Sequence, residues 1–273
     1  MTRGTNDSRF SLKERAALAF FRFLNEDGRA KEATMAFHRV IGRRWVEQSI
    51  KNLLHVEGLD QAVDMDPPRG VLLCSNHRSF FDQYVLSCIL IRRVPWMRRI
   101  YFPVRSNFFY ETFTGMMVNL VVGGGAMYPP IFRDASRADL NKLALQKAID
   151  LLQVRGNMVG VHPEGTRGKG PDPYQLLPAQ PGAGQIALLS KATILPCFIN
   201  GLSNDFVGQV LSNFRRGTGR GQPIVVVFGR PVELGALAEG RPRPAQYKRV
   251  ADHILGEIAK LGEKERAIRS SLV

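Results

Sequence analysis

The sequence predicts an α/β fold in which a mostly parallel sheet is covered by helices and preceded by amphipathic N-terminal helices. Short apolar runs typical of buried strands alternate with longer segments of helical periodicity, which is the pattern of parallel sheets. A chain of 273 residues can also bury a substantial core. We assign residues 1–58 to an N-terminal helical segment that associates with membranes, and residues 59–273 to one α/β domain.

Two amphipathic helices are expected near the start of the chain, at 10–24 and 33–54. Their apolar residues recur at helical spacing, while arginines and lysines occupy the other faces. Basic helices with aromatic side chains are typical of segments that lie on a bilayer surface. Packing on the domain core is the alternative, and different faces of the helices can satisfy both. No signal peptide is expected, because Lys13, Glu14 and Arg15 interrupt the apolar residues.

After residue 70, strand-like runs and helical segments alternate along the chain. The apolar runs expected to be strands are 71–74, 100–104, 158–161, 194–199 and 224–228. The segments expected to be helices are 81–91, 138–154, 182–191 and 245–261. Ser136 and Asp139 begin the second of these helices in the style of a capping box.

The uncharged run 112–132 is long enough to span a membrane, but its composition argues against a span. It contains glycines and prolines that break a helix, whereas lipid requires an unbroken one; they are Gly115, Gly123, Gly124, Gly125, Pro129 and Pro130. We expect this run to be buried core or a loop that dips into the membrane.

The charge balance favours polyanionic partners. The chain has 38 Lys+Arg against 24 Asp+Glu, a net charge of +14, which suits nucleic acid, an anionic membrane surface or phosphorylated substrates. It has neither zinc-finger spacing nor an aromatic RNA-recognition signature, so we expect no nucleic-acid partner. The three cysteines, Cys74, Cys88 and Cys197, show no pairing pattern, which favours reduced thiols in a cytosolic setting.

Two arginine pairs flank a tryptophan in the segment 92–99. Arg92-Arg93 and Arg98-Arg99 stand on either side of Trp96, as in a membrane-interface anchor with an aromatic ring at headgroup level. A solvated loop is the alternative. Given a lipid substrate, the anchor is the favoured interpretation.

The segment 76–82, Asn-His-Arg-Ser-Phe-Phe-Asp, carries the strongest chemical signal. It follows an apolar strand and precedes a helix, and ligands of open α/β sheets bind at that edge. His77 there can act as a general base, oriented by the carboxylate of Asp82. His55 and Asp60 show the same spacing, but His55 is expected near the end of a helix, as a surface or packing residue.

Further motifs follow in order. Glu164-Gly165-Thr166-Arg167 comes directly after the strand-like run 158–161, and Pro196 lies within the apolar run 194–199. Between them and the first motif, Gly125 and the segment 131–133, which ends in Arg133, approximate a further motif with two prolines inserted.

With these motifs the chain resembles the PlsC-like glycerolipid acyltransferases, the family of lysophosphatidic acid and glycerol-3-phosphate acyltransferases. The resemblance covers about residues 70–200 and rests on the patterns N-H-x-S-x-x-D, E-G-T-R and a proline-bearing strand. It implies O-acyl transfer in phospholipid biosynthesis, from acyl-CoA or acyl carrier protein to a lysophospholipid acceptor, with 1-acylglycerol-3-phosphate as the first choice. Glycerol-3-phosphate or a lyso-aminolipid is the alternative acceptor.

The resemblance also implies roles for individual residues. His77 and Asp82 are catalytic. Substrate binding falls to a set of five residues, which are Arg133, Glu164, Gly165, Thr166 and Arg167. Asn76, Ser79 and Pro196 support the site. His162, which precedes the third motif, is read as a structural or supporting residue.

Other chemistry is disfavoured by the motifs that the sequence lacks. There is no G-x-S-x-G elbow for a serine hydrolase, and the spacing of 165–171 does not fit a P-loop. The five histidines show no metal-ligand pairing, so we expect neither a metal nor a cofactor. A non-catalytic basic module that binds membranes or nucleic acid is the competing class. We expect the protein at the cytoplasmic face of the membrane, as a peripheral or monotopic protein.

Overall fold

The computed structural model describes residues 9–217 and 221–272, and its centre is a six-stranded sheet with the order β1-β8-β7-β2-β6-β3. The strands are β1 (Leu54–Glu57), β2 (Val71–Ser75), β3 (Arg99–Tyr101), β6 (Asn157–Val161), β7 (Thr193–Asn200) and β8 (Ile224–Phe228). Neighbours pair in parallel, apart from β7 and β8, which are antiparallel. A second, two-stranded parallel sheet joins β4 (Val104–Arg105) to β5 (Pro130–Ile131). The predicted fold class is confirmed.

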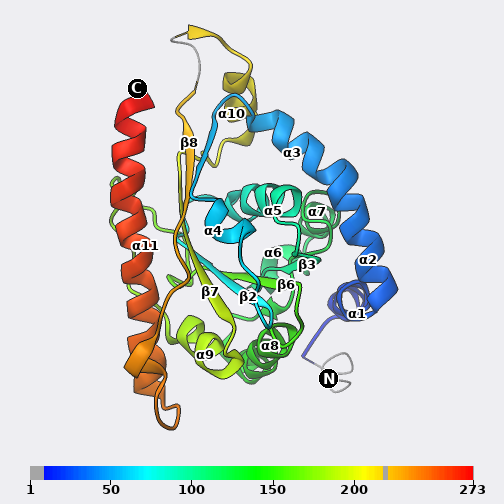
Figure 1. Cartoon of the computed structure of the whole chain (residues 1–273). Coiled ribbons are helices and arrows are strands. Elements are labelled where there is room, and N and C mark those ends of the chain that lie inside the picture. Colours follow the sequence, from blue (N-terminus) through cyan, green and yellow to red (C-terminus); the bar gives the residue numbers. More distant parts are fainter. Residues whose placement is uncertain (1–8, 218–220, 273) are drawn as a thin grey trace.

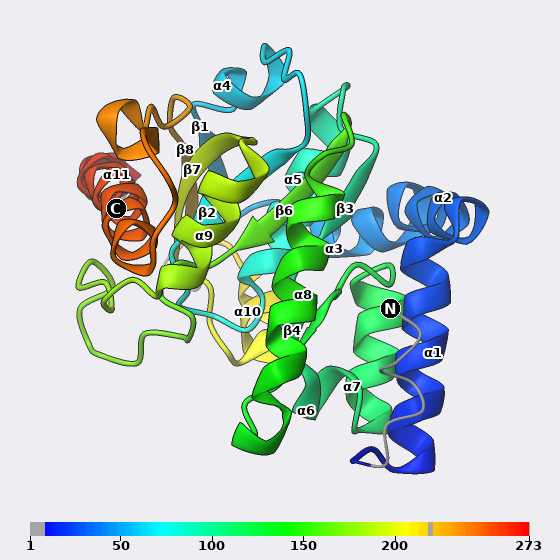
Figure 2. The ribbon, with the colours of Figure 1, turned by 90° about the horizontal axis from the view of Figure 1, so that it is seen from below.

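Helices cover both faces of the sheet (Figures 1 and 2). Along β2 the side chains alternate, so that Leu72 and Cys74 pack in one core while Val71 and Leu73 pack in the other. The first core lies under α8 (Ala138–Leu151), α9 (Pro181–Ser190) and α11 (Pro244–Leu272). The second lies under α5 (Asp82–Arg93) and the N-terminal helices α1 (Leu12–Glu26), α2 (Gly28–Phe37) and α3 (Arg43–Ile50). Both faces of the strands are therefore buried, as parallel sheets require.

The remaining short helices lie in the connections. They are α4 (Asp60–Val63), α6 (Ser106–Phe109), α7 (Phe113–Met117) and α10 (Phe206–Asn213), with the π-turns η1 (His38–Gly42) and η2 (Val118–Val122) and the 3₁₀ turns η3 (Ala135–Arg137) and η5 (Gly235–Ala238). The run 112–132 thus forms α7, η2 and β5, a broken path that its glycines and prolines dictate.

The N-terminal helices are fixed to the sheet by buried polar contacts. Ser11 and Glu14 form a reciprocal capping box that begins α1. Within α2, Lys31 is fully buried, and its Nζ donates to the side chain of Asn25 at 2.8 Å and to the carbonyl of Ile100 at 3.1 Å. The same ammonium lies 4.1 Å from the ring centroid of Tyr101. These contacts tie α1 and α2 to β3.

The structure corrects the second predicted helix. In place of one helix over 33–54, α2 and α3 are joined by a π-turn, and the helix ends at Ile50. His55 then lies on the edge strand β1, not near a helix end. Exposed residues alternate with half-buried ones from Leu54 to Glu57, which is the two-residue period of a strand. Residues 54–57, near the end of the predicted 1–58 helical segment, therefore belong to the central sheet.

Three other boundaries differ from prediction. The run 100–104 is split between β3 and β4. The N-cap of α8 is Arg137 without a side-chain cap, because Ser136 lies in the preceding 3₁₀ turn and donates its backbone N–H to Asp134. The last helix continues to Leu272, well beyond residue 261.

Two further expectations concern the chain as a whole. Within residues 9–217 and 221–272, no helix combines the length and the apolar character needed to cross a bilayer. Cys74, Cys88 and Cys197 are buried, and no disulfide joins any two of them.

Candidate active site

The first motif lies where β2 ends and α5 begins, at the carboxyl edge of the parallel strands. Asn76, directly after β2, is buried, and its side chain makes two hydrogen bonds with the backbone of Ile199 on β7, at 2.9 and 2.8 Å. These bonds fix the loop 76–81 to the neighbouring strand. Asn76 therefore has a clear supporting role: it sets the position from which His77 projects.

The side chains of His77 and Asp82 meet as the spacing predicts. The Nδ1 atom of His77 lies 3.0 Å from Oδ2 of Asp82, and that oxygen also accepts the backbone N–H groups of Arg78 and Ser79 at 2.8 Å each. Asp82 is 1% exposed at the first turn of α5, whose dipole favours a negative charge there. A carboxylate at Nδ1 places the proton on that nitrogen and leaves Nε2 as the basic atom. Ser79 supports the turn by donating its hydroxyl to the carbonyl of Ser203.

His162 lies directly against His77. The two rings are stacked, with centroids 4.0 Å apart and planes within 5°. Nδ1 of His162 lies 3.0 Å from the carbonyl oxygen of Asn76 and 3.2 Å from that of Ser75. Carbonyls only accept hydrogen bonds, so Nδ1 must carry the proton, and Nε2 is a buried acceptor without a partner among the described residues. His162 thus holds the His77 ring from behind.

Burial and nearby charge shift the titration of the pair. Burial lowers the pKa of His77 to about 3, and Arg167 and Arg105 add to the effect. Burial raises the pKa of Asp82 to about 6, against the opposing influence of His162 and the backbone N–H groups. The pKa of His162 is lowered to about 3, chiefly by burial. Near neutral pH both rings are therefore uncharged and Asp82 is ionised, the state in which His77 can accept a proton.

Glu164 acts within the protein instead of facing the cleft. It is 2% exposed, and its two oxygens accept the backbone N–H of His77 at 2.7 Å and that of Leu177 at 2.8 Å. The carboxylate thus joins the first motif to the segment before α9. This geometry favours a positioning role over the predicted contact with substrate. Gly165 follows with φ of 65°, a conformation that glycine adopts without strain.

Two arginines, Arg105 and Arg167, lie beside His77, and the charge of Arg133 acts on Arg105. Arg167 donates to Asn204 at 3.0 Å, and Arg105 donates to the hydroxyl of Thr166 at 2.6 Å. Partial burial, then Arg133 and Arg167, lower the pKa of Arg105, so these three charges share one field. Arg105 is not among the residues that the motifs predict. The sequence feature that could have pointed to Arg105 is that it directly follows the apolar run 100–104, just as the motifs directly follow strand-like runs.

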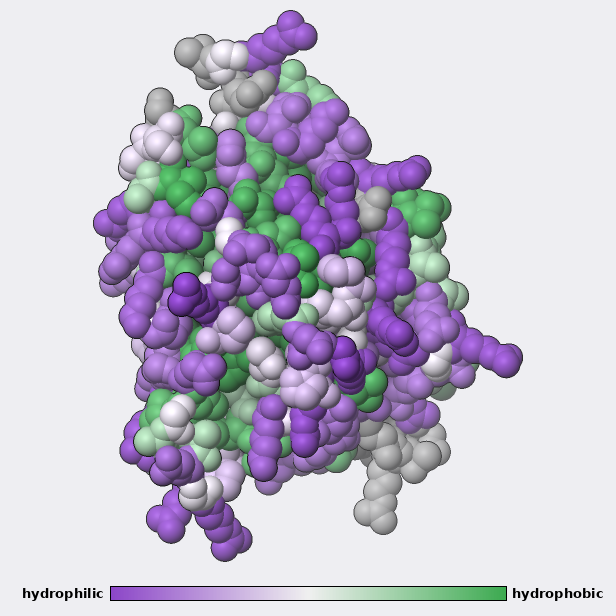
Figure 3. Space-filling view, in the orientation of Figure 1, coloured by the Kyte–Doolittle hydropathy of each residue, from purple (hydrophilic) through white to green (hydrophobic). Residues whose placement is uncertain are grey.

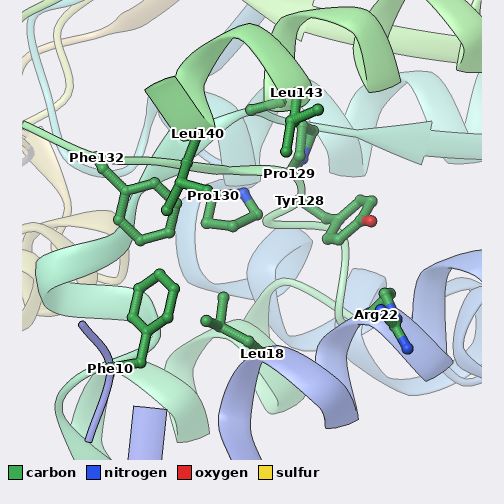
Figure 4. Close-up of a pocket in the computed structure, with 10 residues that line it drawn as sticks. Phe10, Leu18, Arg22, Tyr128, Pro129, Pro130, Phe132, Leu140 and Leu143 are labelled. Carbon is green, nitrogen blue, oxygen red and sulfur yellow. The ribbon is translucent and has the colours of Figure 1, made fainter. Parts of the chain in front are cut away.

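Phe132, the residue directly before Arg133, is held in place by its neighbours (Figure 4). Asn141 on α8 bonds both the backbone N–H and the carbonyl of Phe132, each at 2.7 Å. The ring of Phe132 packs 5.4 Å from that of Phe10 in a small apolar pocket of about 90 Å³. Ile131, one residue earlier, lines the catalytic side. The irregular second motif therefore consists of Ile131, which faces the cleft, Phe132, which is anchored on the other side, and Arg133, which is exposed.

These residues surround one cleft with a volume of about 630 Å³. Its polar wall includes His77, Arg105 and Arg167, and its apolar wall is aromatic, formed by Phe80, Phe102, Phe108 and Phe109. The N-terminus of α9 closes one side through Gly182 and Ala183, whose N–H groups belong to the first helical turn. A basic atom, a cluster of cations and an apolar wall thus share one space.

Two further predictions concern Pro196 and a metal. Pro196 pairs in register with Cys74, and its carbonyl accepts the N–H of Gly229 at 3.0 Å, so it supports the sheet beneath the motifs and does not line the cleft. Among the described residues, no three His, Cys, Asp or Glu side chains are grouped so that they could hold a metal ion.

Comparisons with known proteins agree with the motifs. The model of the family described as Acyltransferase matches residues 54–200. Among solved structures, the chain is similar to the 1-acyl-sn-glycerophosphate (LPA) acyltransferase PlsC from Thermotoga maritima, with a TM-score of 0.50 and 20% sequence identity over 92% of this chain and 88% of that chain. That likeness concerns the fold. No curated protein matches the sequence. Because the family match begins at β1, ends with β7 and covers more than half of the sequence, the chain belongs to the Acyltransferase family.

Proposed function

We propose that the protein transfers a fatty acyl group from a thioester, acyl-CoA or acyl carrier protein, to the hydroxyl of a lysophospholipid, with 1-acylglycerol-3-phosphate as the first acceptor to test. One observation carries the proposal. A buried His77–Asp82 pair opens on a cleft whose other walls are cationic and aromatic. The acceptor needs a base at its hydroxyl, cations at its phosphate and an apolar surface for its chain.

The reaction requires one proton acceptor and no acyl-enzyme. Nε2 of His77 takes the proton of the acceptor hydroxyl while that oxygen bonds to the thioester carbonyl carbon. Asp82, bonded to Nδ1, stabilises the imidazolium that forms. The tetrahedral intermediate then collapses, the C–S bond breaks, and His77 returns its proton to the departing sulfur. Gly182 and Ala183 line the same cleft, and their N–H groups in the first turn of α9 can donate to the oxyanion.

The arginines set the preference for the acceptor. Guanidinium groups bind phosphate through paired donors, and Arg105, Arg133 and Arg167 come from three separate segments of the chain. A phosphomonoester carries the charge to satisfy such a cluster, which supports an acceptor like 1-acylglycerol-3-phosphate. Glycerol-3-phosphate offers the same phosphate without the acyl chain, and a lyso-aminolipid offers a different headgroup. The aromatic wall of the cleft favours an acceptor that brings a chain.

The test is thiol release from acyl-CoA and from acyl carrier protein over a panel of acceptors that includes all three. We expect His77→Ala to reduce kcat by about a thousandfold, in line with the loss of a general base. Asp82→Asn should reduce it strongly as well, because the amide no longer stabilises the imidazolium. Arg167→Gln should raise KM for phosphate-bearing acceptors more than it lowers kcat.

His55→Ala is the matched control. His55 stands five residues before Asp60, the same spacing as His77 and Asp82, but it lies exposed on edge strand β1. Turnover retained in a folded His77→Ala protein would contradict the general-base role. Absence of acyl transfer to every acceptor, together with salt-sensitive binding to bare duplex or vesicles, would favour a non-catalytic basic module.

We also propose that the protein binds peripherally to the anionic cytoplasmic face of a membrane. The residues that support this form an exposed apolar surface over η1, α3 and α10, namely Phe37, Val40, Ile41, Trp45, Val207, Leu211 and Phe214. α10 packs beside α3 (Figure 1) and begins two residues after Asn204. Asn204 accepts a hydrogen bond from Arg167 of the cleft, which places the start of α10 next to the cleft. Figure 3 shows apolar side chains among strongly hydrophilic ones on the face seen in Figure 1. Such a mixture suits the headgroup region of a bilayer.

A further inference from the structure

A second cluster of arginines lies at the opposite end of the sheet from the cleft. Arg39, Arg98, Arg99 and Arg155 line a pocket of about 480 Å³ where β3 and β6 begin. β6 runs from this pocket to the catalytic edge over five residues, a distance of about 15 Å at the rise of a strand. One phosphate group cannot occupy both places, so the two clusters are separate.

The charges in this pocket are not balanced. Arg99 pairs with Glu32 at 2.9 Å, and Arg155 pairs with Asp66. Within the described part of the chain, Arg39 donates only to the carbonyls of Met97 and Arg98, which carry no net charge. Arg98 is exposed and pairs with no acid among the described residues. Two guanidinium charges therefore remain without a counter-ion at the pocket.

The backbone is shaped to hold the unpaired arginine. The carbonyl of Gly156 accepts the N–H groups of Arg98 and Arg99, at 2.7 and 3.1 Å. Gly156 has φ of 85°, and a Cβ there would come within 3.3 Å of the Arg98 side-chain stem. The aliphatic stem of Arg98 thus lies along Gly156, and the guanidinium of Arg98 is available at the pocket. Lys31 is buried nearby, and after burial itself the charge of Arg99 helps to lower the pKa of Lys31 to about 7, so the arginine cluster is felt at this residue.

We propose that this pocket binds a phosphate group, separately from the catalytic cleft and whatever reaction the cleft performs. Forked guanidinium donors suit phosphate oxygens, and two uncompensated charges suit one phosphate. Arg39 lies on η1 directly beside Val40 and Ile41, both 55% exposed. A phospholipid headgroup in a bilayer that meets η1 would be within reach of the pocket. A soluble phosphate compound shares the same chemistry, and the experiment separates the two sources.

The experiment measures pyrophosphate binding by calorimetry in a protein whose arginines at the cleft are replaced (Arg105→Gln, Arg133→Gln, Arg167→Gln), so that this first cluster contributes little. In that background we expect Arg98→Gln to weaken binding about fivefold, and Arg39→Gln with Arg98→Gln about 25-fold, which corresponds to about 1 kcal/mol per guanidinium. Arg241→Gln with Arg243→Gln removes the same charge from an exposed segment elsewhere and should change little. Arg98→Gln alone breaks no side-chain hydrogen bond or ion pair among the described residues, so it serves if the double variant fails to fold.

A second measurement, flotation with phosphatidylglycerol vesicles, identifies the source of the phosphate. Parallel losses on pyrophosphate and on vesicles support a lipid headgroup in the pocket. A loss on pyrophosphate alone supports a soluble phosphate compound. Binding equal to that of the Arg241/Arg243 control would overturn the proposal. So would a loss on vesicles with unchanged affinity for pyrophosphate, because that pattern reports only general surface charge.

Discussion

Single residues determine the electrostatic state of the site. One oxygen of Asp82 receives the imidazole N–H of His77 and two backbone N–H groups, which keeps a fully buried carboxylate ionised near neutral pH. Burial and the neighbouring arginines keep His77 uncharged. The neutral ring of His162, stacked at 4.0 Å, fixes the orientation of His77 without adding charge.

These shifts predict how acyl transfer responds to pH. The reaction needs Asp82 ionised and His77 neutral, and the higher of the two pKa values is that of Asp82, about 6. We expect kcat/KM to be level above that value and to fall as the pH drops through about 6. Arg167 lowers the pKa of both groups, so Arg167→Gln should move the acidic limb to higher pH. The check is a pH profile of both proteins with Arg243→Gln as control; an unmoved limb would contradict the assignment.

At the same scale, the motifs predict that His77 meets Asp82, but they do not predict every contact around the pair. His77, Asp82 and Asn76 are close in sequence at a strand–helix junction, so local rules suffice to place them. Glu164 is different, because its partners are the backbone groups of His77 and Leu177, and no side-chain pattern reports a backbone contact. Arg105 joins the cluster only through tertiary folding of β4 beside β5.

Among the elements, α2 is attached to the sheet by an unusual contact. Lys31 is fully buried and bonds only to neutral groups, those of Asn25 and Ile100. Burial, with help from Arg99, lowers its pKa to about 7. Between that value and its ordinary pKa near 10.5, the unfolded chain binds a proton that the folded protein does not. The folded state is therefore favoured as the pH rises through this range.

The pH dependence of stability tests this contact. From pH 7 to pH 9, we expect the wild-type free energy of unfolding to gain about 2 kcal/mol from this residue. Lys31→Met, which keeps the apolar stem, should lack that gain. Denaturant titrations of both proteins at the two pH values measure the difference. Equal changes in the two proteins would show that Lys31 is not held neutral by its surroundings.

The elements also show where pattern reading stops. The buried strands β2, β6, β7 and β8 and the helices α5 and α9 follow from apolar runs and periodicity. β1 does not, since four residues that alternate half-buried and exposed can continue a helical pattern equally well. Its pairing with β8, some 170 residues later, decides the outcome. In the π-turn η1, His38 packs against Gly124, a contact between distant parts of the chain that no local rule contains.

For the whole molecule, the arrangement of surfaces suggests how it meets a bilayer. Exposed apolar side chains gather on η1, α3 and α10, next to the cleft, while α9 and α11 cover the other face of the sheet. The net charge of +14 adds a long-range attraction to anionic lipid. Binding should therefore combine insertion of apolar side chains with an electrostatic part that salt weakens.

Vesicle flotation separates these two parts. Ile41→Asp removes an exposed apolar side chain and adds a like charge to an anionic surface, so we expect binding to weaken roughly tenfold or more. Leu189→Asp makes the same change on α9, away from the proposed membrane surface, and should have little effect. Raising the salt concentration should weaken both variants and the wild type. Equal losses for the two variants would mean that the proposed surface has no special role.

The convergence of Arg105, Arg133 and Arg167 leaves the empty cleft electrostatically frustrated. Like charges that folding forces together repel one another, and partial burial reduces the screening that water would give. An anion that binds there relieves this repulsion and also forms its own hydrogen bonds. Part of its binding free energy therefore comes from the repulsion that folding imposes on the arginines. The phosphate of the proposed acceptor survives acyl transfer, so the product would relieve the same repulsion. On this proposal, the phosphate does not favour release of the product. Release is driven instead by the transfer of the product's two acyl chains into the bilayer.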